Sequence, residues 1–210
     1  FFNDVRTGVL MGSYTFRLNE FNALAKQLRS SGEAIIQDRR QLEQRTQNDA
    51  LTGVASRAHF EQKLEQLHQQ ARLGLSSAMM VTDIDHLEQI NTDIGTEAGD
   101  ILLKQFARQL REALRTGDTV ARLDGGRFAT LFPFTDLETI QPVVERLRQR
   151  LTEQFDPGTG MPRAFSWSAG LTLISKDDPD MAVILARCEA GLKSAQNNGG
   201  NQTVTHMPPA

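Results

Sequence analysis

Two short apolar segments flank a pair of glycines in Thr119-Val-Ala-Arg-Leu-Asp-Gly-Gly-Arg-Phe-Ala-Thr-Leu-Phe132. Glycine adopts the positive φ angles of a tight turn without steric cost, so this pattern is typical of a β-hairpin. The sequence therefore predicts strands over 119–123 and 127–132, joined by a turn at 124–126. Directly before the hairpin, Arg115-Thr-Gly-Asp118 places a cation and an acid three residues apart.

Helical and strand patterns alternate on both sides of this hairpin. The predicted helices run from a cap at Ser56 to about 71, from Gly99-Asp100 to near Gly117, from 140 to 155 with Pro142 in the first turn, and from about 179 to Asn198-Gly-Gly200. The predicted strands cover an apolar run at 77–82, which ends in Asp83-Ile-Asp85, and an alternating segment at 165–173. Mixed strands and helices around a hairpin predict an α+β sandwich.

Composition limits the classes of function. A chain of 210 residues has room for one domain of about 150 residues and an appendage. The net charge of −3 gives no basic field of the kind that nucleic-acid binding requires, so we expect no nucleic-acid partner. Cys188 is the only cysteine, which excludes an internal disulfide and fits a reducing, cytoplasmic compartment.

No apolar stretch approaches the length of about 20 residues that crosses a bilayer. The sequence starts at Phe1 without methionine, so we expect it to be a piece of a longer protein, and a membrane anchor upstream stays open.

The N-terminal segment has the pattern of a long helix. Leu18, Phe21, Ala25, Leu28, Ile35 and Leu42 follow alternating steps of three and four, interrupted at Gly32 and Arg39. Residues 19–28 are also similar to the second helix of a HAMP linker. We expect residues 1–47 to form a signalling helix or coiled coil that makes a homodimer; packing of the helix on its own domain is the alternative.

The motifs quoted above, together with Asp49-Ala-Leu-Thr-Gly53, Asn91 and Gly99-Asp100, resemble the GGDEF domain of diguanylate cyclases over residues 48–205. The resemblance implies a nucleotide-cyclase-like sheet surrounded by helices, preceded by the segment 1–47 and followed by a tail or linker at 206–210. It also implies a role in bacterial second-messenger signalling.

Several catalytic positions depart from the family pattern. The turn of active members reads Gly-Gly-Asp/Glu-Glu-Phe, whereas here it is Asp124-Gly125-Gly126-Arg127-Phe128, so the second metal acid falls on Gly126 and the next acid on Arg127. The positions of the phosphate-binding cations carry Glu88, Gln196 and Gly200, and Leu87 replaces a phenylalanine. Asp83 matches the first metal acid, with a turn-forming aspartate as the alternative. We therefore expect a vestigial catalytic turn, weak Mg²⁺ binding and no required cofactor.

Two sets of binding residues match the family. Asn91 and Asp100 stand where relatives recognise the guanine edge; the alternative for Asp100 is an acid that favours a helix N-terminus. Arg115 and Asp118 occupy the Arg-x-x-Asp motif that binds the product cyclic di-GMP, and Arg146 stands where some relatives place a supporting arginine. The alternative for this motif is a surface ion pair.

The sequence thus favours a non-catalytic GGDEF domain that acts as a cyclic di-GMP receptor. Three alternatives stay open. One is a module that binds no nucleotide and pairs with a cyclase or phosphodiesterase, and another is a residual diguanylate cyclase. The third is a GTP sensor that uses Asn91 and Asp100.

Overall fold

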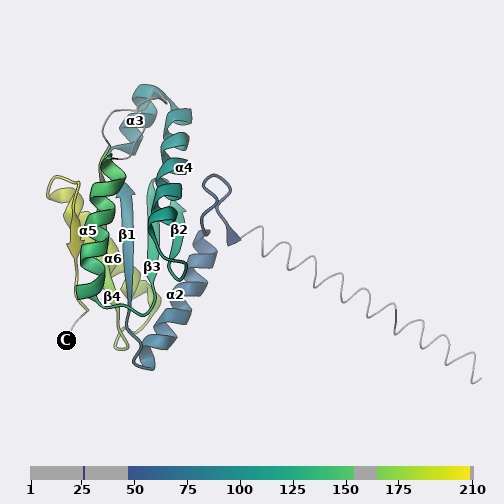
Figure 1. Ribbon diagram of the computed structural model, residues 1–210, viewed down its shortest axis with the longest axis vertical. Coiled ribbons are helices and arrows are strands. Elements are labelled where there is room, and N and C mark those ends of the chain that lie inside the picture. Colours follow the sequence, from purple (N-terminus) through teal and green to yellow (C-terminus); the bar gives the residue numbers. More distant parts are fainter. Residues whose placement is uncertain (1–25, 27–46, 154–164, 209–210) are drawn as a thin grey trace, which may run out of the picture. The chain divides into compact units, whose positions relative to one another are not determined.

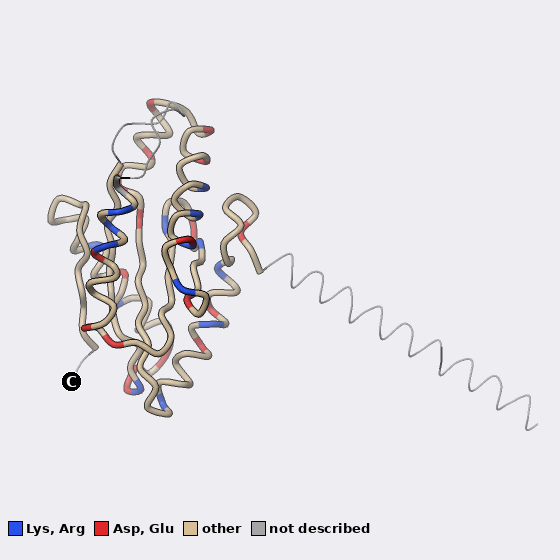
Figure 2. Tube along the Cα trace, viewed as in Figure 1, with Lys and Arg blue, Asp and Glu red and all other residues tan. Residues whose placement is uncertain are grey.

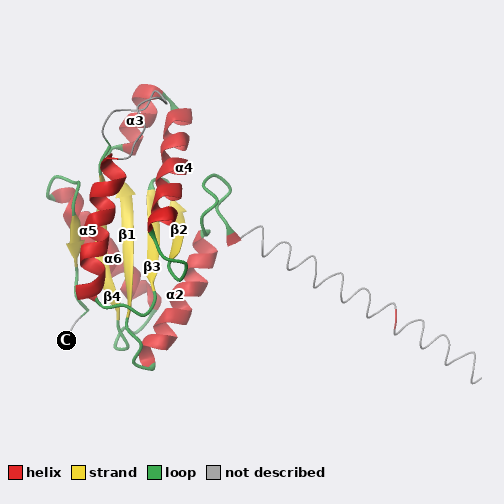
Figure 3. Cartoon of the chain, in the orientation of Figure 1, coloured by secondary structure: helices red, strands yellow, loops and turns green. Residues whose placement is uncertain are grey.

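The computed structural model describes residues 26, 47–153 and 165–208. This part of the chain forms five helices and five strands, which Figures 1 and 3 show. The helices are α2 (Arg57–Arg72), α3 (Leu87–Ile94), α4 (Thr96–Ala113), α5 (Leu137–Glu153) and α6 (Met181–Asn197). The strands are β1 (Ser77–Ile84), β2 (Thr119–Asp124), β3 (Arg127–Phe132), β4 (Trp167–Ile174) and β5 (Thr203–Thr205).

The strands form one sheet in the order β2-β3-β1-β4-β5. Neighbouring strands are antiparallel except for β5, which runs parallel to β4. The predicted hairpin is confirmed as β2 and β3, and its second strand pairs with the central strand β1 so that Asp83 lies opposite Arg127. The mixed sheet and its helices confirm the predicted α+β fold.

Successive residues of β1 supply the cores on opposite faces of the sheet. Met80 and Ile84 pack with α4 and α5, whereas Met79 and Val81 pack with α2 and α6. This arrangement follows from the alternation of side chains along a strand, and a strand covered on both faces must be apolar throughout. Helices thus cover β1 on both faces of the sheet, and Asp83 and Asp85 lie at its C-terminal end, beside the hairpin turn.

Two glycines allow α6 to lie close to the sheet. A Cβ atom at Gly170 would come within 1.9 Å of the carbonyl oxygen of Cys188, and one at Gly191 within 2.8 Å of the carbonyl oxygen of Val204. Backbone atoms cannot move aside as a flexible side chain can, so larger residues would push α6 away from β4 and β5.

Several predicted boundaries were wrong. Gly99-Asp100 does not open a helix, because α4 begins at Thr96, and α4 ends at Ala113 rather than near Gly117. The short α3 and β5 were not predicted; each is brief, and β5 is only partly buried, so neither leaves a clear hydrophobic pattern. Helix α5 begins at Leu137, so Pro142 lies in its second turn rather than its first.

The helix predicted within residues 1–47 lies outside the described residues except for Lys26 and Gln47. Among the residues that the structure does describe, no helix is both long and apolar enough to cross a membrane.

Candidate functional site

The β2–β3 turn is closed by an ion pair between its two ends. The Arg127 guanidinium donates from Nε to Asp124 Oδ1 at 2.7 Å and from Nη2 to Asp124 Oδ2 at 2.5 Å. Its Nη1 donates to Oε1 of Glu189 on α6 at 3.3 Å. Hydrogen bonds from Arg127 lower the pKa of the Asp124 carboxyl, and the same bonds raise the pKa of Arg127. Arg127 is therefore held by two carboxylates of the same domain.

A second arginine ties the turn to the loop before α2. Arg122 donates from Nε and Nη2 to the Gly125 carbonyl oxygen at 3.0 and 2.9 Å, and from Nη1 to Asp49 Oδ1 at 3.3 Å. The same Asp49 oxygen accepts from the backbone nitrogen and hydroxyl of Thr52. The Asp49-Ala-Leu-Thr-Gly53 segment is thus a folded turn that supports the hairpin.

Asp83 lies at the end of β1 and is partly buried. Burial raises the pKa of its carboxyl, and the raising effect exceeds the lowering effects of a hydrogen bond from Gln196 and of the charge of Arg127. The Gln196 bond joins Nε2 to Asp83 Oδ2 at 2.9 Å. Burial therefore makes the ionised form of Asp83 less favourable, and the hydrogen bond from Gln196 offsets only part of this cost.

The neighbouring turn position, Gly126, lies close to two side chains. A Cβ atom at Gly126 would lie 2.8 Å from Leu87 Cδ2 and 2.9 Å from Asp83 Oδ1. Both atoms are the ends of flexible side chains, so these side chains would have to shift to admit a larger residue. Glu88, in the first turn of α3, is exposed.

Asp85 is engaged in structural hydrogen bonds. Its oxygens accept from the hydroxyls of Ser166 at 2.6 Å and Ser168 at 2.7 Å, and from the backbone nitrogen of Asn201 at 3.0 Å. Asp83, Asp85, Gln196 and Gly200 line one cavity of about 330 Å³. Among the described residues, no group of three or more His, Cys, Asp or Glu side chains is placed to hold a metal ion.

Asn91 and Asp100 lie on adjacent helices. The Oδ1 atom of Asn91, on α3, is buried against Gly99 and has no hydrogen-bond partner in the described part of the chain. Asp100 is exposed and lies one turn inside α4 rather than at its N-terminus, so the helix-terminus alternative does not apply to it. A Cβ atom at Gly99 would lie 1.8 Å from this oxygen, so the position of the Asn91 side chain requires glycine at 99.

Arg115 and Asp118 form a compact pair in the loop between α4 and β2. Arg115 Nε donates to Asp118 Oδ1 at 3.0 Å, its backbone nitrogen donates to Asp118 Oδ2 at 3.3 Å, and its Nη2 donates to the carbonyl oxygen of Pro133. The Asp118 side chain is 6% exposed, whereas that of Arg115 is 58% exposed. The acid is thus fixed in place, while the arginine presents part of its guanidinium to solvent.

The structure brings the three residues of the predicted cyclic di-GMP site together. Arg115 and Asp118, from the loop after α4, and Arg146, from α5, line one cavity of about 210 Å³. Helices α4 and α5, which flank this cavity, carry several of the basic residues of the domain (Figure 2).

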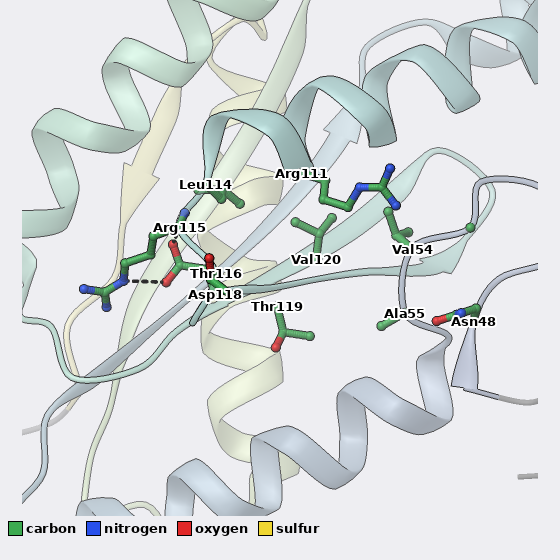
Figure 4. A pocket seen from close by; sticks show the side chains of 11 residues that line it. Asn48, Val54, Ala55, Arg111, Leu114, Arg115, Thr116, Asp118, Thr119 and Val120 are labelled. Carbon is green, nitrogen blue, oxygen red and sulfur yellow. Dashed lines mark hydrogen bonds and ion pairs between the residues drawn. The ribbon is translucent and has the colours of Figure 1, made fainter. Parts of the chain in front are cut away.

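A second cavity of about 400 Å³ lies on the other side of the same ion pair (Figure 4). Arg111 projects beside it from α4, four residues before Arg115, and Asn48 lies at its far end. The sequence analysis did not single out Arg111, because no motif includes it; it reaches this cavity because α4 ends at Ala113 and the loop with Arg115 follows directly.

The α+β sandwich, with a hairpin turn beside the acidic end of its central strand, defines a nucleotide-cyclase-like domain. The chain belongs to the GGDEF family, because the profile described as "Diguanylate cyclase, GGDEF domain" matches residues 46–202.

Curated relatives carry names from the same signalling system. The chain is 35% identical over 184 residues to the diguanylate cyclase DgcP of Pseudomonas aeruginosa, which covers 87% of this chain and 26% of DgcP. It is 30% identical over 161 residues to the cyclic di-GMP phosphodiesterase NbdA of the same species, covering 76% of this chain and 20% of NbdA. The chain thus spans about a quarter or less of the length of these relatives.

Solved structures share the fold. The coiled coil and GGDEF domain of DgcB from Caulobacter crescentus, in complex with c-di-GMP, matches with a TM-score of 0.75 at 23% identity, covering 87% of this chain and 99% of that one. The diguanylate cyclase SiaD from Pseudomonas aeruginosa, in complex with its activator SiaC, matches with a TM-score of 0.72 at 26% identity, covering 97% and 82%.

Proposed function

We propose that this domain is a receptor for cyclic di-GMP that does not catalyse its synthesis. The observation that carries the proposal is the convergence of Arg115, Asp118 and Arg146 on one cavity. The proposal includes a coupling of ligand occupancy to the geometry of a homodimer formed through the segment 1–47. It also includes a cyclase or phosphodiesterase as the partner that responds.

The chemistry of the cavity suits a guanine nucleotide with a phosphodiester. An arginine fork matches the O6 and N7 acceptors of guanine or two phosphate oxygens, and a carboxylate accepts from guanine N1–H and N2–H₂. Because Arg115 and Asp118 already hold each other, little side-chain ordering is needed when ligand arrives. Arg146 is exposed and would add positive charge from the opposite wall.

The size of the cavity indicates how much of the ligand it could enclose. About 210 Å³ is below the range of roughly 300 to 1,000 Å³ that encloses a drug-sized ligand. We therefore propose that one base enters this cavity and that the rest of the ligand lies over the loop and the neighbouring hollows.

Three features of the turn support the absence of catalysis. Gly126 offers no carboxylate, the end of the Leu87 side chain lies beside it, and Arg127 places a guanidinium near Asp83. Divalent cations such as Mg²⁺ need several oxygen ligands. Asp85, the other carboxylate near Asp83, already accepts hydrogen bonds from two hydroxyls and a backbone nitrogen. The residues present do not fit a catalytic Mg²⁺ site.

Isothermal titration with cyclic di-GMP tests the proposal. The whole chain should bind saturably, and Arg115→Ala should weaken binding at least tenfold, because a hydrogen bond to a charged group contributes about 1.5 to 3 kcal/mol. Arg108→Ala is the matched control, since Arg108 lies on α4, outside the lining of the cavity, and pairs with Glu112. Absence of binding by the unaltered chain, or unchanged binding by Arg115→Ala, would sink the receptor proposal.

A residual diguanylate cyclase is the second candidate, favoured by the 35% identity to DgcP. Incubation with GTP and Mg²⁺ or Mn²⁺, followed by chromatography, separates the two functions. We expect no cyclic di-GMP to form. Product that disappears in Asp83→Ala would establish the cyclase instead.

A further inference from the structure

Phe134 is an exposed aromatic residue in a strained backbone conformation. Its side chain is 64% exposed and its φ angle is +53°. Bulky residues with a β-carbon rarely adopt this left-handed region, so the position costs conformational energy unless the surroundings enforce it. A residue that serves only the core would be buried, and Phe134 is not.

The surrounding hydrogen bonds enforce the conformation. The backbone nitrogen of Phe134 donates to Ser77 Oγ at 3.3 Å, and that of Thr135 donates to the Ser76 carbonyl oxygen at 3.1 Å. Arg115 donates to the carbonyl oxygen of Pro133, the residue before Phe134. The same arginine that lines the proposed ligand cavity therefore also holds the backbone that presents the Phe134 ring.

Phe134 forms one wall of a hollow of about 160 Å³ against α2. Lys63, Leu67 and Gln70 lie along the α2 side, and Gly117 and Thr119 close the end nearest Arg115. Thr119 also lines the 400 Å³ cavity that contains Arg115 and Asp118. Through Gly117, the hollow adjoins the loop that carries the ion pair.

The ring of Phe134 gives this hollow a flat aromatic wall. A planar base matches such a wall, because every base has a π-face that stacks on an aromatic side chain. The side-chain oxygen of Gln70 is buried, so it does not take part in this contact.

We propose that Phe134 is a stacking residue for a guanine base of cyclic di-GMP anchored at Arg115 and Asp118. This assignment rests on the proposed function and extends it, because it places one base outside the Arg115 cavity. Lys63, which also lines the hollow, supplies positive charge for the adjoining phosphate. Aromatic stacking of this kind tolerates any base, so the selection of guanine stays with Arg115 and Asp118.

Titration of two variants with cyclic di-GMP tests the role of the ring. Phe134→Asn keeps a residue that tolerates positive φ and removes the ring, so its thermal midpoint should equal or exceed that of the unaltered chain. Its affinity should fall about 5- to 150-fold, the range for loss of one base–aromatic stack. Phe134→Trp should retain the affinity, and Leu73→Ala, which removes another exposed apolar side chain on the surface, should not change it.

Fluorescence of Phe134→Trp gives a second measurement that does not depend on the asparagine variant. Stacking on a base should quench the new tryptophan, whereas the buried Trp167 of the unaltered chain should report no comparable change. Equal affinity of Phe134→Asn and the unaltered chain, or no quenching in Phe134→Trp at saturation, would overturn this role and leave the receptor function standing. Failure of the unaltered chain to bind would overturn both.

Discussion

Arg127 and Asp124 face each other across the β2–β3 turn and share two hydrogen bonds of 2.7 and 2.5 Å. In the turn of active cyclases that this chain resembles, a glycine stands at position 124 and an acid at position 127. The two departures from the family pattern therefore form one interacting unit: the acid at 124 neutralises the base at 127, and the turn closes on itself.

We expect Arg127→Gln to lower stability by up to about 1 kcal/mol at neutral pH, because both partners are partly exposed and such ion pairs contribute little. The pKa of Asp124 is lowered in the folded state, so its contribution is present above the unfolded value of about 3.9 and is lost as pH falls below it. Urea unfolding of both proteins between pH 7 and 3 should show the difference shrinking toward acid. A difference that grows toward acid would contradict the ion pair.

Gly126→Glu, which restores an acid at the second metal position, should destabilise the domain only slightly and should not produce cyclase activity. The new Cβ atom would displace the ends of the Leu87 and Asp83 side chains, which are flexible and can shift at low cost. Gly117→Ala is the stability control, since a Cβ atom there would meet open space. Combining Gly126→Glu with Leu87→Ala should recover part of the lost stability. Without such recovery, the Leu87 contact is not the cause.

Asp83→Asn should stabilise the domain at neutral pH. Burial raises the pKa of Asp83, so the folded state binds the proton more tightly than the unfolded chain, and stability is lost as pH rises through the folded pKa. The neutral amide avoids this cost and can still accept from Gln196. The gain should therefore be present at pH 7 and absent below about pH 4, near the unfolded pKa. Destabilisation at pH 7 in thermal unfolding would show that the charge itself is needed.

Cys188 should be inert in the folded protein. Burial raises the pKa of its thiol to about 12, and the side chain is inaccessible between α6 and the sheet. Because the thiolate is the reactive form, a disulfide reagent such as Ellman's should not modify it at pH 8 until denaturant is added. Rapid modification under native conditions would show that α6 opens from the sheet far more readily than its packing implies.

Local patterns in the sequence predicted the elements that have strong local signals. The glycines at 125 and 126 marked the hairpin, Ser56 marked the start of α2, where its hydroxyl accepts from the His59 nitrogen, and the apolar run at 77–82 marked β1. The start of α4 was missed because Gly99, expected to open the helix, instead packs against Asn91 of a neighbouring helix. A contact between two helices cannot be predicted from the spacing of residues along either helix.

The same distinction applies to the candidate site. The residue types at 115, 118, 126 and 127 could be predicted from the sequence, because motif spacing and charge are properties of the chain itself. The contacts between these and other groups could not be predicted, because they depend on how distant segments pack. Arg146 reaches the cavity of Arg115 from another helix, and the end of the Leu87 side chain lies beside Gly126. Gln196 donates a hydrogen bond to Asp83, which lies 113 residues earlier in the sequence. The strained backbone of Phe134 is held by Ser77 at the start of β1 and by Arg115.

By itself, then, the sequence determined the family, the α+β fold and the inventory of charges, since these follow from local propensity, periodicity and motif spacing. The tertiary structure alone decided which charges neutralise each other, which acceptors stay unpaired and which hollows adjoin Arg115. Those outcomes depend on distances between residues far apart in the chain, and such distances are set only when the helices pack on the sheet.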